Sequence, residues 1–279
     1  MGYVSMITIR GNQGGFPGLN ASHKANAETS SALAKLSSGQ RINKASDDAA
    51  ALAIATQMAA ELKSLNQASR NAYDGLSLLE TGDAGLGGTA DLLARARELA
   101  MQASNGTLSD GQRGFIQNEL GGIMSEIDRV ARATELGGKT LLDGSGETLQ
   151  FQVGTQGGPG ETLSVTGADA TLNGLGIAGL NLGSAAGAQD ALSRIDDALA
   201  NVSQIRARFG ATARQFESGI ANIQNIVVNT ATAHSRIMDA DVASESAQLA
   251  MSQIQGQASS SVMAQANQSR ASVLRLLGS

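Results

Sequence analysis

Prolines are almost absent from this chain, and their placement limits what it can fold into. Of 279 residues two are proline, Pro17 and Pro159. Proline interrupts a helix because it lacks the amide hydrogen and clashes with the preceding turn, so the two long proline-free stretches permit continuous helices. Aromatic residues make up 3% of the chain, whereas large rings normally fill compact cores and deep ligand pockets. We therefore expect long helices that pack through small side chains.

The first stretch predicts a long helix from about Ser46 to Ser104. It opens with Ser46, Asp47 and Asp48, whose short polar side chains suit the capping of free amides and the positive end of the helix dipole. Apolar or small residues then recur at alternating steps of four and three, which is coiled-coil spacing with two polar interruptions. Four glycines weaken the middle of the helix by about 1 kcal/mol each relative to alanine. The sequence therefore leaves a local break in the helix there as an alternative. The expected seam comprises Met58, Leu62, Leu65, Ser69, Ala72, Leu76, Leu79, Asp83, Leu86, Ala90 and Leu93, and the glycines are Gly82, Gly85, Gly87 and Gly88.

A second helix is expected to fold back on the first. Residues 105–107, Asn-Gly-Thr, read as a turn, and Ser109 with Asp110 then supplies an N-terminal cap. The apolar face of this helix is broad enough to pack against a neighbouring helix. That face is predicted to carry Phe115, Ile116, Leu120, Ile123, Ile127 and Val130.

The middle of the chain, from Gly137 to Gly187, has a different pattern. Glycine is dense there, and residues 148–153 and 162–165 alternate polar with apolar side chains, which is typical of strands. The loop from Gly154 to Gly160 contains Pro159 and suits a turn, so one small β-hairpin is expected.

The heptad pattern returns from about Ala188 and predicts a second rod. Because the strand-rich segment lies between the two rods, the simplest path sends the chain out and back, with the rods antiparallel. The second seam is expected to comprise Ile195, Leu199, Val202, Arg206, Phe209, Ala213, Phe216, Ile220, Ile223, Val227, Thr230, His234 and Ile237.

The expected fold is therefore mainly α, with long antiparallel helical hairpin or coiled-coil rods and a small β-hairpin segment in mid-chain. Both ends are rich in small and polar residues, and their apolar residues are too sparse for stable isolated helices. We expect them to order only against other copies of the chain. The predicted organisation is an N-terminal arm at 1–45, rod helices at 46–136, a β-rich segment at 137–187, a C-terminal rod helix at 188–238 and a C-terminal arm at 239–279.

Charge and composition exclude several classes of function. The formal net charge is −5 and no run of Lys and Arg is present, so neither nucleic acid nor an anionic membrane surface is an expected partner. No stretch of about 18 apolar residues predicts a membrane span, and residues 1–10 lack the features of a secretory signal peptide. The absence of cysteine rules out disulfides and thiolate metal sites.

Few individual residues are candidates for catalysis or metal binding, and no catalytic residue, metal or cofactor is predicted. Asp47 with Asp48, and Asp239 with Asp241, suit helix capping better than a metal because no partner ligands fall at metal spacing. His23 and His234 lack any accompanying nucleophile pattern. Residues 174–179 satisfy GxGxxG, but the strand and helix that should flank a dinucleotide site are missing from the pattern.

Several blocks of sequence, in one shared order, resemble bacterial flagellins. The signature block is Leu36-Ser37-Ser38-Gly39-Gln40-Arg41-Ile42-Asn43, followed by residues 47–50 and 52–54. Further matching blocks lie at 71–75, 98–100, 105–107, 126–129, 151–154, 208–211, 235–241 and 265–268. Residues 1–19 depart from the family's usual start. Any single motif is a hypothesis until its structural context is seen, but the shared order is specific.

The resemblance implies a non-enzymatic subunit that polymerises with itself into an extracellular flagellar filament, in a short form without large outer domains. It also implies export through the flagellar type III apparatus, and partners that include that apparatus, a chaperone, and cap and hook-junction proteins. An assembly role follows for Leu36, Ser37, Ser38, Gly39, Arg41, Ile42, Asn43, Asp47, Asp48, Arg208, Phe209, Ser235, Arg236, Asp239, Asp241, Gln265 and Asn267. A contact with the vertebrate flagellin-sensing Toll-like receptor follows for Arg95, Leu99 and Glu119, residues that equally suit packing between subunits.

Two alternatives to a filament subunit stay open on the sequence alone. A hook-filament junction or related flagellar axial protein shares the helical ends but would not polymerise indefinitely. A generic intracellular coiled coil would form defined dimers.

Overall fold

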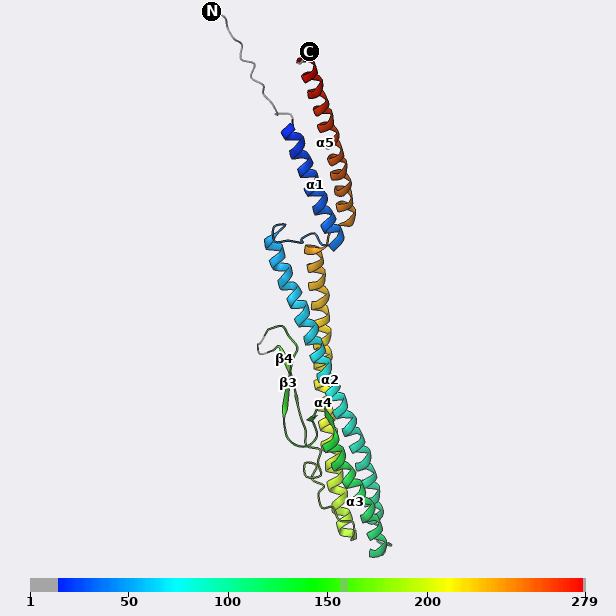
Figure 1. The fold of residues 1–279 in the computed structure, drawn as a ribbon. Helices are drawn as coiled ribbons and strands as arrows, with labels where there is room; N and C mark the ends of the chain where they lie inside the picture. Colours follow the sequence, from blue (N-terminus) through cyan, green and yellow to red (C-terminus); the bar gives the residue numbers. More distant parts are fainter. Residues whose placement is uncertain (1–14, 157, 159, 278–279) are drawn as a thin grey trace, which may run out of the picture. The chain divides into compact units, whose positions relative to one another are not determined.

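The computed structural model describes residues 15–156, 158 and 160–277, and it is dominated by helices (Figure 1). The glycine-rich start of the chain up to residue 14, and Pro159 in the expected turn, lie outside the described residues. The chain divides into two compact units, one taking residues up to Ala59 together with those from Thr230 on, the other Ala60–Asn229. The helices are α1 (Gly15–Ser38), α2 (Ala49–Ala103), α3 (Asp110–Ala133), α4 (Ala185–Met238) and α5 (Val242–Leu277); the strands are β1 (Glu135–Leu136), β2 (Lys139–Thr140), β3 (Thr148–Gln152) and β4 (Thr162–Thr166).

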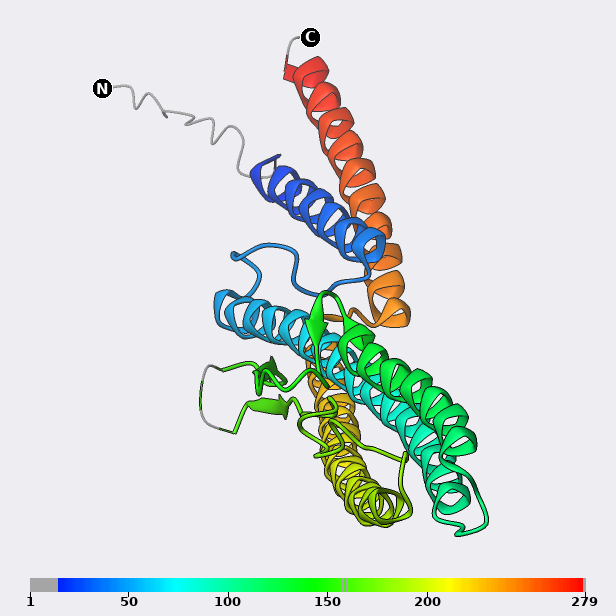
Figure 2. The ribbon, with the colours of Figure 1, turned by 90° about the horizontal axis from the view of Figure 1, so that it is seen from below.

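The Ala60–Asn229 unit, which we call the rod unit, is built from α2, α3 and α4 lying side by side (Figures 1 and 2). The expected second rod is present as α4, and α2 runs unbroken past the glycines at 82, 85, 87 and 88. Its buried core is continuous along the three helices and extends under the mid-chain segment, where Leu142, Ile177 and Leu182 are fully buried. The predicted fold class, mainly α with a small β segment, is confirmed.

The expected seam of α2 consists of two rows of residues, each repeating every seven positions, which we call rails. One rail lies where the sequence predicts it, and the other is shifted by one residue. The rail Leu65, Leu79 and Leu93 is buried as expected. The second rail uses small residues, among them Ala68, Gly75, Gly82, Thr89 and Ala96, instead of the expected Ser69, Leu76, Asp83 and Ala90, which are only half-buried.

Aromatic rings from α4 explain this shift. Phe209 and Phe216 are almost completely buried, and they lie directly over glycines of α2. A Cβ atom built at Gly82 would stand 2.7 Å from Cε2 of Phe209, and one at Gly75 would stand closer still to Phe216. The rings therefore occupy the space that side chains at these positions would need, and a large residue fits only on the adjacent rail.

The polar interruptions of the two expected seams pair with each other. Arg206 of α4 is not a buried seam residue as the sequence suggested, because its guanidinium reaches Asp83 of α2, with Nε 2.8 Å from Oδ1. Both side chains are 44% exposed. The pair thus lies at the edge of the helix interface, where it can stay hydrated.

Helix α3 begins as its sequence predicts. Ser109 is its N-cap, and Ser109 and Gln112 form a reciprocal capping box. The buried face holds Ile116, Leu120, Ile123 and Ile127, with Arg113 and Ala131 on the same face. Phe115 was assigned to this face wrongly, since its side chain is 77% exposed; it falls outside the steps of three and four that connect the buried residues.

The mid-chain segment forms two antiparallel hairpins. β3 pairs with β4 as predicted, with Leu149 opposite Val165 and Phe151 opposite Leu163. The ring of Phe151 meets that of Phe216 edge-on at 5.7 Å, which ties the hairpin to the rod. The short β1–β2 pair was not anticipated; its turn consists of Gly137 and Gly138, both with positive φ, as such a turn requires.

The terminal unit holds α1 and α5, which pack against each other. Each helix covers small residues of the other, and the expectation that both ends order only against other copies stays a prediction. The contact is thin: its fully buried residues are Ala25, Ala32 and Ser252. Polar links reinforce it, with Thr29 bonded to the Ser252 hydroxyl at 3.0 Å and Lys35 to Glu245 at 2.9 Å. In the part of the chain that the structure describes, no helix is both long and apolar enough to cross a membrane.

Two glycines of α2 should respond oppositely to the same substitution. Gly82→Ala should lower the free energy of unfolding by about 1–3 kcal/mol, because its Cβ displaces the Phe209 ring. Gly87→Ala should raise it by up to about 1 kcal/mol, because nothing lies within 4 Å of its Cβ and alanine favours helix. Urea unfolding followed by circular dichroism measures both. Equal effects of the two substitutions would contradict ring-against-glycine packing.

Candidate assembly surfaces

The signature block forms a junction within the terminal unit. Gly39 adopts a left-handed conformation at φ +69°, which ends α1 and turns the chain. Arg41 then donates from its backbone amide to the carbonyl of Met238 at 2.6 Å and from its guanidinium to the carbonyl of Ile237 at 2.7 Å. The amide of Ala240 returns a bond to the carbonyl of Gly39 at 3.0 Å. The N-terminal chain is thereby fastened to the point where α4 ends.

Ile42 connects this junction to a small apolar core. Its side chain is 2% exposed and packs with Ala55 and Met238 in a small core of its own. Gly39 and Arg41, in contrast, are exposed. Part of the block thus serves internal packing, and the polar part around it faces outward.

Three of the four aspartates of the matching blocks accept hydrogen bonds from backbone amides, and the fourth accepts from a hydroxyl. Asp48 accepts from the amide of Ala51 and so caps α2 as predicted. Asp47 instead accepts from the amides of Asn43 and Lys44 at 3.0 Å each, and these bonds hold the pKa of its carboxyl below the ordinary value. Asp241 caps α5 through the amides of Ala243 and Ser244, and Asp239 accepts from the Ser235 hydroxyl. No group of three or more candidate metal ligands occurs among residues 15–156, 158 and 160–277.

The remaining predicted assembly residues separate by exposure. Phe209 belongs to the buried core of the rod unit, so its side chain is unavailable to another copy. Leu36, Asn43 and Ser235 are half-buried. The exposed members are Ser37, Ser38, Arg208, Arg236, Gln265 and Asn267.

Of the three residues expected at an immune receptor, two lie on the surface. Arg95 of α2 bridges to Glu119 of α3 at 2.7 Å and to Glu98 at 2.9 Å, and both links raise the pKa of its guanidinium. Leu99 is 2% exposed and packs in the core. Its side chain therefore supports the surface from beneath and cannot itself reach a partner, so for Leu99 the sequence expectation is corrected.

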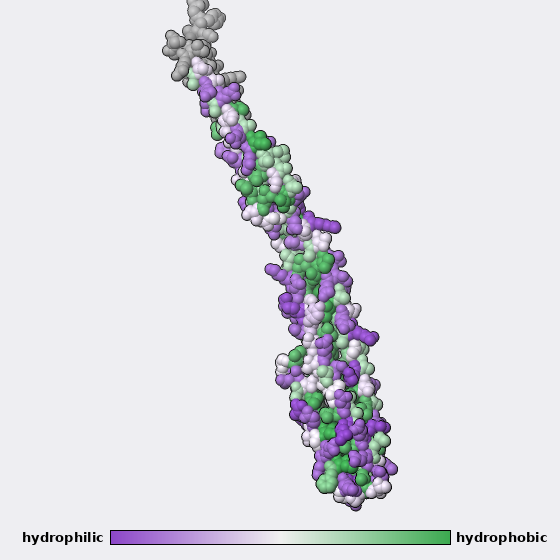
Figure 3. All heavy atoms as spheres, turned by 90° about the vertical axis from the view of Figure 1, so that its right-hand side faces the viewer, coloured by the Kyte–Doolittle hydropathy of each residue, from purple (hydrophilic) through white to green (hydrophobic). Residues whose placement is uncertain are grey.

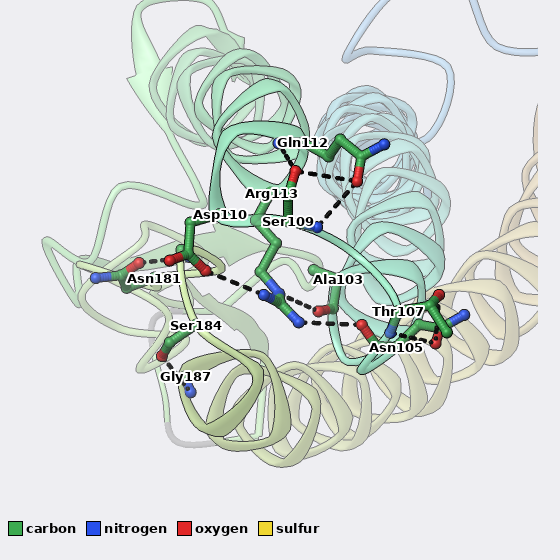
Figure 4. Close-up of polar contacts among 11 residues, drawn as sticks. Ala103, Asn105, Thr107, Ser109, Asp110, Gln112, Arg113, Asn181, Ser184 and Gly187 are labelled. Atoms are coloured by element: carbon green, nitrogen blue, oxygen red, sulfur yellow. Dashed lines mark hydrogen bonds and ion pairs between the residues drawn. The ribbon is translucent and has the colours of Figure 1, made fainter.

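A buried cation that the sequence argument missed closes the end of the rod unit (Figure 4). Arg113 of α3 is 6% exposed, yet it lies on the otherwise apolar face of its helix. Its guanidinium donates to the carbonyl of Ala103 at 2.9 Å, to that of Asn105 at 3.0 Å, and to Asp110 at 3.2 Å. The carbonyl of Ala103 is one of the acceptors left at the end of α2, where a positive charge is favoured, and that of Asn105, in the following turn, also accepts from the amide of Leu108. The Arg113 side chain therefore stabilises the turn between α2 and α3.

Exposed ion pairs also link the helices of the rod. Hydrogen bonds from Arg206 lower the pKa of Asp83, and those from Arg97 lower the pKa of Asp196. Both pairs join α2 to α4. Exposed pairs of this kind add little free energy each, but they favour one register of the two helices over others.

The GxGxxG segment is part of this scaffold. Gly176 and Gly179 have positive φ, and Arg194 of α4 donates to the carbonyls of Gly176 and Ala178. Leu175 and Ile177 are buried in the rod core. The segment is a turn held against α4, and neither a strand before it nor a helix directly after it provides the frame of a dinucleotide site.

Comparison with protein families identifies both helical regions. The description "Bacterial flagellin N-terminal helical region" matches residues 19–147, and "Bacterial flagellin C-terminal helical region" matches residues 192–277. The chain belongs to the bacterial flagellin family. Flagellins are structural proteins that self-assemble into the flagellar filament, an extracellular appendage, so this chain is a filament subunit and not an enzyme.

Individual flagellins and related structures agree with this assignment. A flagellin from Halalkalibacterium halodurans is 39% identical, covering 88% of this chain and 90% of the relative. The crystal structure of Bacillus cereus flagellin is 31% identical, with a TM-score of 0.50 over 55% of this chain and 88% of that one. A putative flagellar hook-associated protein from Vibrio parahaemolyticus, 16% identical with a TM-score of 0.59 over 69% of this chain and 100% of that one, shares the fold alone. Neither a junction protein nor a generic coiled coil is the favoured identity.

Loss of the buried cap should destabilise the rod. Arg113→Met keeps the aliphatic length but removes the guanidinium donor from the carbonyl of Ala103 and one of two donors from that of Asn105, so the free energy of unfolding should fall by about 1–3 kcal/mol. Arg129→Met is the matched control, because Arg129 is exposed on the same helix and pairs with Glu126 on the surface. Chemical unfolding measures both; a loss at Arg129 as large as at Arg113 would refute the capping role.

Acid should weaken the Asp83–Arg206 link. Because Arg206 lowers the pKa of Asp83 in the folded chain, the link contributes stability above the ordinary carboxyl pKa of 3.8 and loses it as the pH falls through the lowered value. Both side chains are 44% exposed, so the contribution is about 0.5 kcal/mol or less. Unfolding measured from pH 6 to 2.5 should show a shallower acid slope for Asp83→Asn than for Asp74→Asn, which removes a carboxylate elsewhere on α2. Identical slopes would exclude the link.

Proposed function

We propose that α1 and α5 are the parts of this subunit that hold copies together in the filament core. The observation that carries the proposal is the incomplete burial of the terminal unit. Its two helices bury little more than small residues, while Leu33, Met251, Ile254 and Val262 remain 51%, 51%, 69% and 60% exposed. This pair of helices exposes larger apolar residues than it buries. Contact with further copies would bury that apolar area and is therefore favourable.

The charge distribution of α5 supports the same conclusion. No Asp, Glu, Lys or Arg occurs from Ser246 to Ser269. A helix that permanently faces water normally carries charged residues on its outer side. Here that side consists of Ala, Ser, Gln and scattered apolar residues, which identical helices can cover without burying an unpaired charge. Figure 3 shows apolar residues uncovered among polar ones on one face of the molecule.

The matching blocks then take two roles in this proposal. Gly39, Arg41, Ile42, Asp47, Asp48, Asp239 and Asp241 fix the junction from which the two arms start. Ser37, Ser38, Arg208, Arg236, Gln265 and Asn267 have exposed side chains and are candidates for direct contact with other copies. The domain roles follow: 1–45 and 239–279 as core arms, 46–136 and 188–238 as wall, and 137–187 as a small outer segment.

The export route and the remaining partners belong to the same proposal. Thin packing of the terminal unit makes it the easiest part to unfold, since ordering costs about 1–2 kcal/mol per residue and little burial offsets it. Such arms suit passage through the flagellar type III apparatus and binding by a chaperone, before the subunit meets the cap and hook-junction proteins. Arg95 and Glu119 remain candidates for the Toll-like receptor surface.

Apolar contacts of α5 should control polymerisation without controlling folding of the rod. The double substitution Met251→Gln, Ile254→Asn should raise the critical concentration for filament growth at least about tenfold, because it removes exposed apolar area that only neighbours can cover. The thermal unfolding of the rod unit should stay unchanged. Gln253→Asn, on the same exposed helix, is the control.

Electron microscopy and sedimentation at rising concentration provide the readout. Long tubes from the unsubstituted chain are expected, and short closed oligomers would favour a junction protein. Filament growth by the double variant at the original critical concentration would remove the basis for the proposal.

A further inference from the structure

Phe115 has no packing role within its own chain. It lies outside the buried face of α3, and the residue is 77% exposed. Several glycines lie near it on the helix, and a Cβ built at Gly111, Gly114 or Gly122 would meet nothing within 4 Å. These glycines serve no contact inside the chain, although each weakens the helix by about 1 kcal/mol. The result is a single aromatic side chain exposed among glycines and the polar side chains of Gln112, Asn118 and Glu119.

The same rod unit carries an apolar groove of about 500 Å³ on another side. Its walls come from α2, the β1–β2 hairpin and β3, and its apolar lining consists of Leu78, Leu136, Leu149 and Phe151. Leu136 is 41% exposed within it, so the groove is lined by apolar atoms that its own chain leaves uncovered. Asp74 and Lys139 provide its charged members.

Phe115 cannot fill the groove of its own chain. Leu136 follows the end of α3 at Ala133, whereas Phe115 lies near the start of that helix. The 18 residues from Phe115 to Ala133 span about 27 Å of helix at 1.5 Å per residue. Any Phe115 that enters the groove must therefore belong to a second copy.

We propose that Phe115 of one subunit inserts into the Leu78–Leu136–Leu149–Phe151 groove of the next. The projecting residue and the groove are different patches, so the contact is heterologous and leaves one free projection and one free groove at the two ends of any row of copies. This contact rests on the proposed function and deepens it, because it names a second adhesive surface, in the rod unit and independent of the arms. Copies of one orientation would be staggered along α3 by roughly 27 Å.

The absence of cysteine permits a direct test of this pairing. Phe115→Cys and Leu136→Cys are introduced into separate chains, which are mixed, polymerised and bridged with a short bismaleimide. Cross-linked dimers should form in the mixture and not with either variant alone. The double variant in one chain should give a ladder of covalent multimers, because each link leaves both ends open. Met101→Cys mixed with Leu136→Cys is the matched control, since Met101 is 55% exposed on α2 of the same unit and should not cross-link.

A second measurement avoids dependence on the cross-linker. Phe115→Ala should raise the critical concentration about tenfold with an unchanged unfolding transition, whereas Met101→Ala should leave both unchanged. Filaments that form without the 115–136 cross-link, cross-links of Phe115→Cys with itself, or equal effects of the two alanine variants would overturn the inference while the proposed function stands. Failure of the unsubstituted chain to form filaments would overturn both.

Discussion

The contact on which the rod depends is the seating of the Phe209 and Phe216 rings against glycines of α2. These two rings and the ring of Phe151 are three of the five phenylalanine rings in a chain that has no tryptophan. The glycines let α4 approach α2 closely enough for the rings to lie between the helix backbones. Once α2 and α4 are in this register, Asp83 meets Arg206 and Arg97 meets Asp196 without further adjustment. The ion pairs follow from the register and do not create it, because their exposed charges contribute little free energy.

The same constraint explains where reasoning from the sequence succeeds and where it fails. Heptad spacing identifies one rail of α2 correctly because Leu65, Leu79 and Leu93 are large and apolar on any hydrophobicity scale. It misplaces the other rail, because a glycine required for close approach resembles a glycine that breaks a helix. Gly82 and Gly87 differ only in what stands opposite them, and that information lies more than a hundred residues away in the chain. The capping box at Ser109 is local, and for that reason it is predictable.

The candidate assembly residues show a similar division. Family blocks identify the junction around Gly39–Ile42, but they do not separate residues that hold one chain together from residues that face other copies. Ile42, Leu99 and Phe209 prove to be core residues, whereas Arg41 and Arg236 are exposed. Arg113 was missed because an arginine on an apolar helix face looks like an interruption of the pattern. Besides Asp110, its partners are backbone carbonyls, which carry no signature in the sequence.

A subunit that polymerises must be stable enough to hold its surface shape and incomplete enough to need neighbours, and the two units of this chain divide these requirements. The rod unit has a continuous core and a locked turn, so its exposed features, including Phe115 and the groove beside Leu136, keep fixed positions before any partner arrives. Preformed surfaces bind with little ordering cost. The terminal unit has a thin interface, and residues 246–269 of α5 carry no charged side chain, so in the proposed filament its packing is completed by association. A contact formed early by the rod would raise the effective concentration of the arms around a growing end, and the weak helix surfaces would then associate as if they were present at millimolar levels. The proposed filament therefore grows directionally, because a rigid, specific contact between rod units is combined with a weaker, more extensive contact between terminal units.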